Sequence, residues 1–371
     1  MEIEKIKVAI VYDRVNKWGG AERILLALHQ IFPKADLFTS VYNPKTASWA
    51  KVFPNVYTSF LQKIPFAKSF HQGLPWLMPL AFESFNFDNY DLVISLTSEA
   101  AKGIITKPKT KHLCYLLTPT RYLWSHYDDY FKNGVLRFLS RPIVSYLRYW
   151  DKIAAFRPDK IVSISQEVRK RVKKYYGLES EVIYPPIYFG DTNFKNPLHL
   201  DLGFNPQDYY LVVSRLEPYK KVNLVVEAFN QLGNNLIVIG TGSQMFFLKR
   251  KAGPNVKFLG KVSDGALAFY YQNAKALIMP QYEDLGLVSL EAQSYFLPVI
   301  AYRKGGACET VLEEKTGVFF DKQEVFSLVD AINRFAKMKF NRDDFKSNLQ
   351  RFSFDRFREL FLNEVLELLK K

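Results

Sequence analysis

Cysteine is almost absent from this sequence of 371 residues. Only Cys114 and Cys308 occur, far apart and without the spacing of metal ligands. Neither a disulfide framework nor a zinc site is indicated, and a reduced cytosol is the expected environment.

Long apolar runs are missing as well. No segment reaches the roughly 18 uninterrupted apolar residues that a membrane-spanning helix needs. The start, MEIEKIKVAIVYD, mixes acidic and basic residues before a short apolar run, which is the wrong order for a signal peptide. We therefore expect a chain that does not cross a membrane.

Acidic residues are outnumbered by basic ones. The chain has 51 Lys and Arg against 37 Asp and Glu, a formal net charge of +14, so it should attract phosphates. Nucleic acid, an anionic membrane or a phosphorylated ligand would all qualify. Apolar residues at 48% and charged residues at 24% are typical of a globular protein, and the length favours two domains of comparable size.

Short apolar runs alternate with helical patterns in both halves of the chain. Runs that are apolar throughout are typical of parallel strands buried on both faces. Two such series predict an α/β fold of two doubly wound, Rossmann-like domains. The expected strands are IKVAIVY, ADLFTSV, DLVISL, KHLCYLL and KIVSIS in the first half, and YYLVVSRL, NLIVIGTG, NVKFLGKV, ALIMPQ, PVIAY and TGVFF in the second.

The predicted domain boundary lies near Ile187. The stretch EVIYPPIYFGDTNFKNP is rich in proline and turn formers, so it is interpreted as a hinge. This gives a first domain over residues 1–187 and a second over residues 188–352. The final segment, 353–371, has apolar residues at helical spacing and is predicted to be a helix that returns to the first domain.

The stretch EDLGLVSLEAQS follows the predicted strand ALIMPQ, where a strand gives way to a helix. Gly286 permits a tight turn there, and the amides of Leu287, Val288 and Ser289 would be unpaired donors at the helix start. Aligned with the helix dipole, such donors form a site for a phosphate group.

Glu283 and Glu291 flank this helix start. Because carboxylates repel a phosphate, their expected partners are the hydroxyls of a ribose or another sugar, which donate hydrogen bonds to them. The pair therefore fits a nucleotide-sugar. Two glutamates alone are more often part of a solvated loop and a solvated helix face, so this prediction depends on the other segments.

Cations follow another predicted strand, in VVSRLEPYKKVNLVVEAF. Arg215 and Lys220 lie at its carboxyl end, where positive charge can neutralise a departing diphosphate in place of a metal. A surface lysine pair is usually no more than solvated charge. No Asp-x-Asp pair occurs in the chain, which argues against a metal-bridged diphosphate, and no cofactor or metal ion is expected.

Glycine loops follow predicted strands in both halves. Gly19 and Gly20 stand between the first strand and the first helix, where backbone can approach a phosphate closely. Lys304 and Gly305 follow the strand PVIAY in the same way. The loop IGTGSQ lacks the third glycine of the dinucleotide fingerprint, so a hydride-transfer enzyme is disfavoured.

The segments GGAER, SRLEPYKKVNLVVEAF, EDLGLVSLEA and AYRKGGACETV resemble, in order and spacing, those of the retaining glycosyltransferases of family four, and the resemblance spans nearly the whole chain. It implies the GT-B fold, in which two Rossmann-like domains face a central cleft. On EDLGL, TPTRYLW and the YPP hinge, the sequence looks most like mannosyltransferases that use GDP-mannose to build bacterial O-antigen and related polysaccharides.

The resemblance implies a role for each donor-side residue. Arg215 and Lys220 would hold the donor diphosphate, Glu283 the hydroxyls of the donor sugar, and Glu291 the ribose. The turn at Gly19–Gly20 would approach the phosphates from the other domain. The implied reaction is attack by an acceptor hydroxyl on the face that the nucleotide diphosphate leaves, which retains the anomeric configuration without a metal ion.

One position departs from the family. Relatives commonly have a histidine directly before the TP of the TP-x-RY segment, whereas CYLLTPTRYLW has Leu117. Leucine neither accepts a proton nor donates a hydrogen bond, so another group near Thr118, Arg121 or Tyr122 substitutes, or the acceptor chemistry differs. Of the scattered histidines, His126 is the acceptor-side candidate.

Two segments mix basic residues with aromatic ones: SFLQKIPFAKSFHQGLPWLMPLAFESF and GVLRFLSRPIVSYLRYWDKIAAFR. Either they lie on an anionic membrane surface, or their apolar residues pack into the first domain. Acceptors in pathways of the resembled family are often glycans on a polyprenyl diphosphate at the cytoplasmic leaflet, so peripheral association with the inner face of the membrane is expected.

Three alternatives remain at this point. Basic patches with aromatics occur in nucleic-acid binders, although no DNA or RNA motif is recognisable and nucleic acid is not expected as a partner. Leu117 is compatible with a sugar-nucleotide-binding protein that has lost catalysis. A transferase that uses a UDP-sugar donor also fits the residues.

Overall fold

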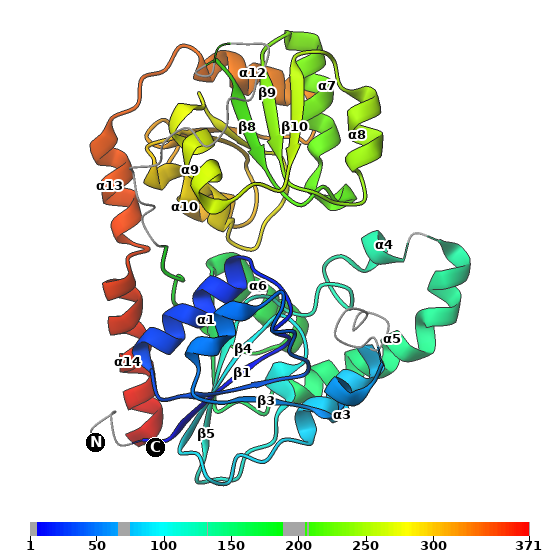
Figure 1. Ribbon diagram of the computed structural model, residues 1–371, viewed down its shortest axis with the longest axis vertical. Helices are drawn as coiled ribbons and strands as arrows, with labels where there is room; N and C mark the ends of the chain where they lie inside the picture. The colour runs from blue at the N-terminus through cyan, green and yellow to red at the C-terminus, as the bar shows by residue number, and fades with distance from the viewer. Residues whose placement is uncertain (1–5, 66–74, 132, 188–204, 206–207, 371) are drawn as a thin grey trace. The chain divides into compact units, whose positions relative to one another are not determined.

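The computed structural model describes residues 6–65, 75–131, 133–187, 205 and 208–370 (Figure 1). It divides into two compact units. Unit 1 comprises Met1–Pro186 and Phe354–Lys371, and unit 2 comprises Ile187–Ser353. Most of the predicted hinge, residues 188–197, lies outside the described residues, as do residues 66–74 of the first basic and aromatic segment.

Unit 1 is built on a parallel sheet in the order β3-β2-β1-β4-β5-β6-β7 within the described residues. Five of its strands coincide with the apolar runs of the first half, because a strand buried on both faces has no polar side. The strands are β1 (Val8–Tyr12), β2 (Asp36–Thr39), β3 (Val56–Thr58), β4 (Leu92–Thr97), β5 (Lys111–Leu116), β6 (Lys160–Ser163) and β7 (Glu181–Val182).

The edge strand β7 corrects one prediction. Glu181 and Val182 open the stretch that was interpreted as a hinge, yet they pair with Val162 and Ser163 of β6. A strand of two residues carries no alternation of apolar and polar positions that a sequence could show. The sheet therefore extends into the predicted hinge.

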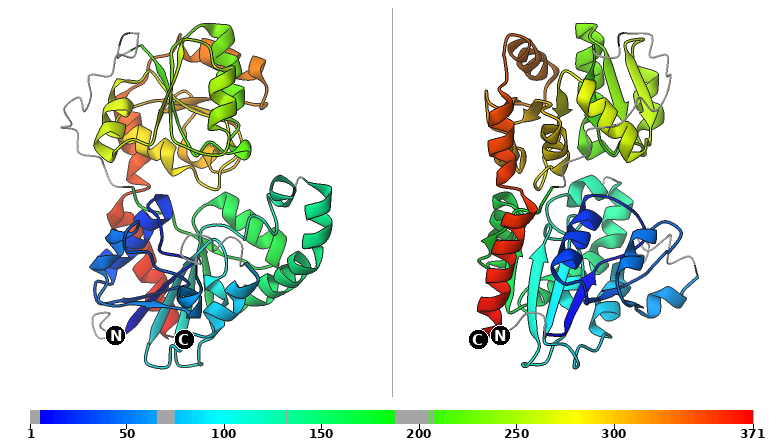
Figure 2. Two further views of the ribbon diagram at one scale, coloured as in Figure 1. Left: turned by 45° about the vertical axis from the view of Figure 1, so that its right-hand side comes forward. Right: turned by 60° about the vertical axis from the view of Figure 1, so that its left-hand side comes forward.

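Helices cover both faces of the unit 1 sheet (Figure 2). They are α1 (Gly20–Ile31), η2 (Ser48–Val52), η3 (Phe60–Lys63), η5 (Pro75–Leu77), α3 (Met78–Glu83), η6 (Ala101–Gly103), α4 (Tyr127–Tyr130), α5 (Gly134–Ala154), α6 (Gln166–Tyr176) and α14 (Phe354–Lys370).

The final helix, α14, packs on unit 1 although the chain has by then passed through unit 2. The rings of Phe357 and Phe361 lie 5.8 and 5.7 Å from that of Tyr115 on β5. Glu364 forms an ion pair with Lys160 at the start of β6. One apolar stripe of the helix is thus buried on the sheet, as expected of an amphipathic helix.

Unit 2 has a parallel sheet in the order β10-β9-β8-β11-β12-β13 within the described residues. Its strands are β8 (Tyr210–Val213), β9 (Leu236–Ile239), β10 (Val256–Gly260), β11 (Leu277–Met279), β12 (Val299–Tyr302) and β13 (Gly317–Phe320). The helices are η7 (Pro218–Lys220), α7 (Val222–Leu232), α8 (Met245–Lys251), α9 (Asp264–Asn273), α10 (Leu287–Ser294), α11 (Ala307–Thr310), α12 (Val325–Phe335) and α13 (Arg342–Gln350).

Alternate residues of the unit 2 strands enter two separate cores. Tyr210 and Val212 face one core with Phe229 of α7, whereas Tyr209 and Leu211 face the other with residues of α9 and α10. This alternation is the period of two of a pleated strand. With helices on both faces and parallel strands in both sheets, the predicted α/β class of two doubly wound domains is confirmed.

The strand order reverses once in each sheet. In unit 1 the reversal lies between β1 and β4, and in unit 2 it lies between β8 and β11. Successive connections leave such a point in opposite directions, so ligands of open α/β sheets bind there, outside the carboxyl ends of the strands. The loops after these four strands are therefore where a site is expected.

Candidate functional site

An ion pair spans the reversal point of unit 2. Lys220, in the loop after β8, donates to Oε1 of Glu283, in the loop after β11. The same oxygen accepts a hydrogen bond of 2.9 Å from Nε2 of Gln281. The two charged side chains are only 11% and 14% exposed. The structure thus brings together two of the predicted residues from segments more than 60 positions apart.

Arg215 lies beside this pair and is held by an aromatic ring. Its Nη2 donates to the hydroxyl of Tyr219 over 2.7 Å, and the guanidinium lies 6.0 Å from the ring centroid. Nζ of Lys220 is 5.4 Å from the same ring. Tyr219 therefore contacts both predicted cations. Sequence reasoning missed it, although an aromatic residue directly before the lysine pair was the available signal.

The turn that carries Lys220 is strained. Lys221 has φ of 54°, in the left-handed region that side chains with a Cβ avoid. This residue ends η7 and begins α7. The strain sits directly beside the ion pair, as is common for residues held in place by their surroundings at functional sites.

Glycines hold the Glu283 loop in place. Gly305 has φ of 67°, and a side chain there would clash with the ring of Tyr282 and the carbonyl of Glu283. Glu283 and Gly305 form a parallel bridge, and the amide of Gly306 donates to the Glu283 carbonyl over 2.9 Å. The loop after β12 thus serves as a platform for Glu283, which is a role for Gly305 that the sequence did not reveal.

The start of α10 differs in one detail from the prediction. Gly286 precedes the helix with φ of 87°, as a tight turn requires. However, the amide of Ser289 donates to the Gly286 carbonyl over 2.9 Å, so this amide is not an unpaired donor. The amides of Leu287 and Val288 head the helix, where helix geometry gives them no acceptor within the helix itself.

Glu291 lies on α10, one turn further on. It is half-buried, and its Oε2 accepts a hydrogen bond of 3.4 Å from the hydroxyl of Tyr271 on α9. The rings of Tyr271 and Tyr295 stack with centroids 5.7 Å apart. Lys304, on the loop after β12, is exposed, and its Nζ is 5.6 Å from the ring of Tyr282.

Two further glycines support the Arg215 loop. A side chain at Gly240 would clash with the carbonyl of Ser214, and one at Gly242 with the backbone of Leu216. The amide of Leu216 donates to the carbonyl of Thr241 over 2.9 Å. The loop after β9, set aside at the sequence level for lacking a nucleotide fingerprint, therefore fixes the position of the loop that carries Arg215.

The reversal point of unit 1 is organised differently. Asp13, directly after β1, is buried and its carboxylate accepts four hydrogen bonds of 2.8 to 2.9 Å from the loop after β4. The donors are the hydroxyl of Thr97 and the amides of Ser98, Ala100 and Ala101. Arg14, the next residue, forms an ion pair with Glu99.

Gly19 and Gly20 stand where the sequence placed them, at the start of α1. Gly19 is in extended conformation, and a side chain there would lie 3.1 Å from Oε2 of Glu22. Glu22 is buried and accepts a hydrogen bond of 2.6 Å from the hydroxyl of Tyr12. Burial and the Glu22 charge raise the pKa of Tyr12. The lack of a side chain at Gly19 thus accommodates Glu22.

The acceptor-side candidates differ in exposure. Thr118 is buried, and its hydroxyl accepts a hydrogen bond of 3.3 Å from Arg171. Arg121 and His126 are half-buried, and the Arg121 carbonyl accepts from the His126 amide over 2.9 Å. Nδ1 of His126 lies 2.7 Å from the hydroxyl of its neighbour Ser125. Leu117 is buried in the same segment.

A buried carboxylate behind this segment was not predicted. Asp151 of α5 pairs with Lys102 over 2.5 Å, and each side chain is 1% exposed. Its two oxygens also accept from the side chains of Thr120, Trp124 and Tyr176 over 2.7 to 2.9 Å. Asp151 therefore fixes the TPTRYLW segment to α5 and α6.

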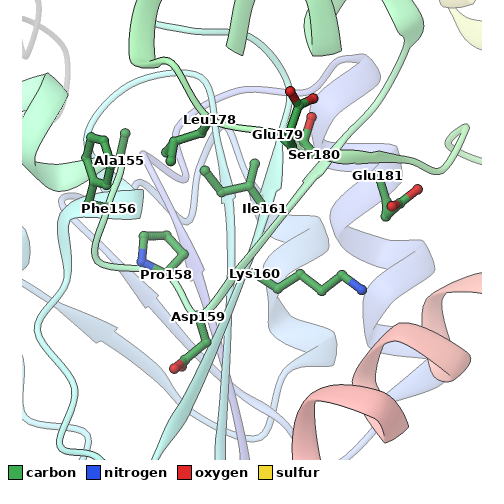
Figure 3. A pocket seen from close by; sticks show the side chains of 10 residues that line it. All are labelled: Ala155, Phe156, Pro158, Asp159, Lys160, Ile161, Leu178, Glu179, Ser180 and Glu181. Carbon is green, nitrogen blue, oxygen red and sulfur yellow. The ribbon is translucent and has the colours of Figure 1, made fainter. Parts of the chain in front are cut away.

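A cavity of about 250 Å³ opens at the other edge of the unit 1 sheet (Figure 3). It lies at the amino ends of β6 and β7 and is lined by residues 155–156, 158–161 and 178–181. Burial lowers the pKa of Lys160 there, but the hydrogen bond and charge of Glu364 outweigh burial and raise it overall. This cavity lies away from the carboxyl-end loops that hold the predicted residues.

None of the described helices is long and apolar enough to span a membrane. Nor do three or more His, Cys, Asp or Glu side chains gather as a metal-ligand cluster anywhere in that part of the chain.

Part of the chain matches a known protein family. Residues 199–352 match the family described as glycosyl transferases group 1. An uncharacterized glycosyltransferase of Methanocaldococcus jannaschii is 26% identical over 193 residues, which cover 50% of this chain and 52% of that protein. A GDP-mannose-dependent alpha-(1-6)-phosphatidylinositol monomannoside mannosyltransferase of Mycobacterium tuberculosis is 28% identical over 211 residues, which cover 50% and 54%. The chain spans about half the length of these relatives.

The likeness to solved structures covers more of the chain. The Anabaena HepE protein in complex with UDP-glucose superposes with a TM-score of 0.71 at 18% identity, over 97% of this chain and 99% of that one. At such an identity the likeness concerns the fold. The two units therefore form a GT-B fold, and residues 199–352 of it are similar to glycosyl transferases group 1.

Proposed function

We propose that the chain is a retaining, metal-independent glycosyltransferase that moves a hexose from a nucleotide-diphosphate sugar to a hydroxyl of a glycan or lipid-linked acceptor. The observation that carries the proposal is the Lys220–Glu283 pair at the reversal point of unit 2, with Arg215 beside it. A buried cation, an exposed cation and a carboxylate at this place suit a ligand with a diphosphate and sugar hydroxyls.

The cations would act on the leaving group. Arg215 and Lys220 donate to the diphosphate oxygens, where negative charge grows as the bond from the sugar C1 to the phosphate oxygen breaks. Lys220 has three N–H donors, so it can serve a phosphate while it still holds Glu283. Glu283, fixed by Gln281 and the Gly305 platform, accepts from the sugar hydroxyls.

The acceptor hydroxyl then attacks C1 on the face that the diphosphate leaves. The new C1–O bond forms there, the configuration is retained, and the departing phosphate oxygen takes the proton of the hydroxyl. No base from the protein is required, which suits a segment with Leu117 in place of a histidine.

The remaining donor contacts come from neighbouring loops. The amides of Leu287 and Val288 meet the phosphates at the head of α10. Glu291 accepts hydrogen bonds from the ribose hydroxyls. Lys304 and Gly305 add further contacts to the phosphates. In this proposal Gly19 and Gly20 approach from unit 1 when the domains close over the donor.

Arg121 and His126 are the proposed acceptor contacts because both are partly exposed. Thr118 is proposed with them through its hydroxyl, which now accepts from Arg171.

GDP-mannose is the donor we favour. The similarity to a mycobacterial mannosyltransferase named as GDP-mannose-dependent supports it. A UDP-sugar is the second candidate, because the HepE structure contains UDP-glucose. The proposed acceptor is a glycan, free or on a polyprenyl diphosphate, in cell-surface polysaccharide synthesis at the inner face of the cytoplasmic membrane.

The test is transfer from GDP-mannose and from UDP-glucose to octyl hexosides, with release of the nucleotide measured beside transfer. One donor should support transfer, and Glu283→Gln and Lys220→Ala should each lower kcat about a hundredfold or more. Lys221→Gly, a change at the adjacent exposed cation that also relieves the positive φ, is the matched control and should stay active. Release without transfer would favour the alternative of a protein with altered catalysis, and full activity of both variants contradicts the site.

A further inference from the structure

The helix α5 has two unlike halves. In its second half, Val144, Leu147, Trp150 and Ala154 are buried against the rest of unit 1. In its first half, up to residue 143, no described side chain is buried. Figure 1 shows α4 and the first half of α5 standing away from the unit 1 sheet. The first half of this helix therefore lacks the buried packing that usually stabilises a helix in water.

The uncovered side of α5 is apolar. Val135, Phe138, Leu139 and Tyr149 are 65% to 70% exposed. Ile143, Tyr146 and Ile153 extend the row and are also exposed. Apart from the adjacent pair Phe138 and Leu139, successive members are three or four residues apart, so they share one side of the helix. Contiguous apolar surface of this kind is rare on a free soluble protein and marks an interaction site.

A basic row borders the apolar one. Arg137, Arg141, Arg148 and Lys152 follow each other at spacings of four, seven and four residues and thus lie on one flank of the helix. Arg137 pairs with Asp128 of α4 and the half-buried Arg148 donates to the Leu123 carbonyl, whereas Arg141 and Lys152 are exposed. The only acidic residue of α5 is Asp151, which is buried and paired with Lys102. An apolar stripe with Lys and Arg alongside is the pattern of a helix that lies in the interface of an anionic membrane.

We infer that the outer side of α5, defined by Val135, Phe138, Leu139, Ile143, Tyr146, Tyr149 and Ile153 with the basic row, is a docking surface for an anionic lipid bilayer. The apolar row enters the boundary between headgroups and acyl chains, and the basic row meets the lipid phosphates. The inference rests on the proposed function, in which the acceptor is linked to a membrane lipid. It deepens that proposal by assigning the membrane contact to one helix.

Two other occupants fit the surface less well. A second copy of the chain would set the same patch against itself around a two-fold axis, so the basic rows would meet like charge. Nucleic acid would use the basic row, but it offers nothing to the aliphatic side chains of Val135, Leu139 and Ile153. A bilayer satisfies both rows at once.

The test is co-sedimentation of the whole chain with vesicles of phosphatidylcholine alone or with about one-third phosphatidylglycerol. The wild type should bind the anionic vesicles and bind the neutral ones far more weakly. Arg141→Gln with Lys152→Gln should weaken anionic binding about 25-fold, roughly fivefold for each lost charge. Leu139→Glu with Tyr149→Glu should abolish binding to both vesicles.

Phe326→Glu is the matched control, because Phe326 on α12 of unit 2 is 83% exposed and lies outside the surface. It should bind like the wild type. The inference is overturned if the wild type stays in solution with anionic vesicles at low salt, or if the double glutamate variant still binds. It is equally overturned if that variant splits a dimer seen by sedimentation velocity, or loses binding to duplex DNA, without any vesicle binding by the wild type.

Transfer to a soluble octyl hexoside separates this inference from the proposed function. None of the substituted side chains belongs to the donor or acceptor site, so every surface variant should keep the wild-type rate in the absence of vesicles. If the wild type transfers sugar but does not bind vesicles, only the docking surface is refuted. If it binds vesicles but does not transfer sugar, only the proposed function is refuted.

Discussion

The two sheets differ at the point where their strand order reverses. In unit 1 a carboxylate accepts hydrogen bonds from backbone amides, whereas in unit 2 two charged side chains pair with each other. Asp13 accepts hydrogen bonds from three amides and one hydroxyl at the end of β4 and in the loop that follows it. Lys220 and Glu283 are paired across the corresponding loops of unit 2, and Arg215 is exposed beside them.

The difference shows which edge is suited to a charged ligand. Breaking the contacts of Asp13 would leave buried amides without acceptors, so that edge is fixed. In unit 2 Lys220 and Glu283 are largely buried but hold each other through side chains, Arg215 is exposed, and Lys220 can add a phosphate to its partners without abandoning Glu283. The comparison therefore supports the proposal that the donor binds to unit 2, while the edge of unit 1 is held fixed by Asp13.

The largest expected effect is on the stability of unit 1. Asp13→Ala should lower the free energy of unfolding by at least about 3 kcal/mol, because three amides, those of Ala100 and Ala101 buried and that of Ser98 half-buried, lose their acceptor. Asp13→Asn keeps an oxygen acceptor and should recover part of the loss. Urea denaturation measures both. A loss below about 1 kcal/mol for the alanine variant would show that this carboxylate does not fix the edge.

The next effect concerns catalysis in unit 2. Arg215→Ala should lower kcat about a hundredfold, because one donor to the departing diphosphate is lost. Its unfolding midpoint should not change, since the side chain is exposed. Arg250→Ala, which removes an exposed arginine from α8 in the same unit, is the control. Equal rates for the two variants would contradict the role of Arg215.

A smaller effect is predicted for pH. Burial, followed by the charge of Arg157, lowers the pKa of His112 to about 3, while an unfolded histidine titrates near 6.5. Between these values the unfolded chain binds the extra proton, so stability is present above about pH 6.5 and falls as the pH drops towards 3. At pH 5 the loss should be about 2 kcal/mol.

His112→Gln keeps a polar partner for the Ser95 hydroxyl, which lies 2.8 Å from His112 Nε2. Urea denaturation above pH 6.5 and at pH 5 measures how much unfolding free energy is lost between the two. The loss in this variant should be smaller than that in the wild type by about 2 kcal/mol. An identical loss in variant and wild type would place the acid sensitivity elsewhere.

The smallest effect is predicted at Tyr219. Tyr219→Phe removes the hydrogen bond to Arg215 but keeps the ring, and it should lower kcat about fivefold, the equivalent of one hydrogen bond. Tyr219→Leu also removes the ring beside Lys220 and should cost more. The midpoint of urea denaturation should be the same in both variants and the wild type, whereas a purely structural role of Tyr219 would lower it. Unchanged rates in both variants would show that Tyr219 does not position the cations.

Much of the fold was predictable because its strands are buried. The runs of β1 and β9 are apolar throughout, as expected of a strand that is covered on both faces. The helix α14 was predictable from its single apolar stripe. The strand β7 was not, because two edge residues form no pattern.

The charged residues of the candidate site could be predicted because each follows a recognisable strand. The contacts between their loops could not. Arg215, Lys220 and Glu283 each follow a recognisable strand, but their pairing depends on the order of strands in the sheet. The supporting roles of Gly240 and Gly305 arise from contacts with distant backbone. Asp13 accepts from residues 84 or more positions away and Asp151 from residues 25 or more positions away, and nothing local in the sequence marks either residue.

Isothermal titration calorimetry of nucleotide-sugars tests the central claim most directly, namely that the loops after β8 and β11 of unit 2 bind the donor diphosphate. GDP-mannose or UDP-glucose should bind the wild type, and both Arg215→Ala and Lys220→Ala should weaken that binding about tenfold or more, as expected for a lost charged hydrogen bond. Unchanged binding in both variants, or no binding of either donor to the wild type, would contradict the account.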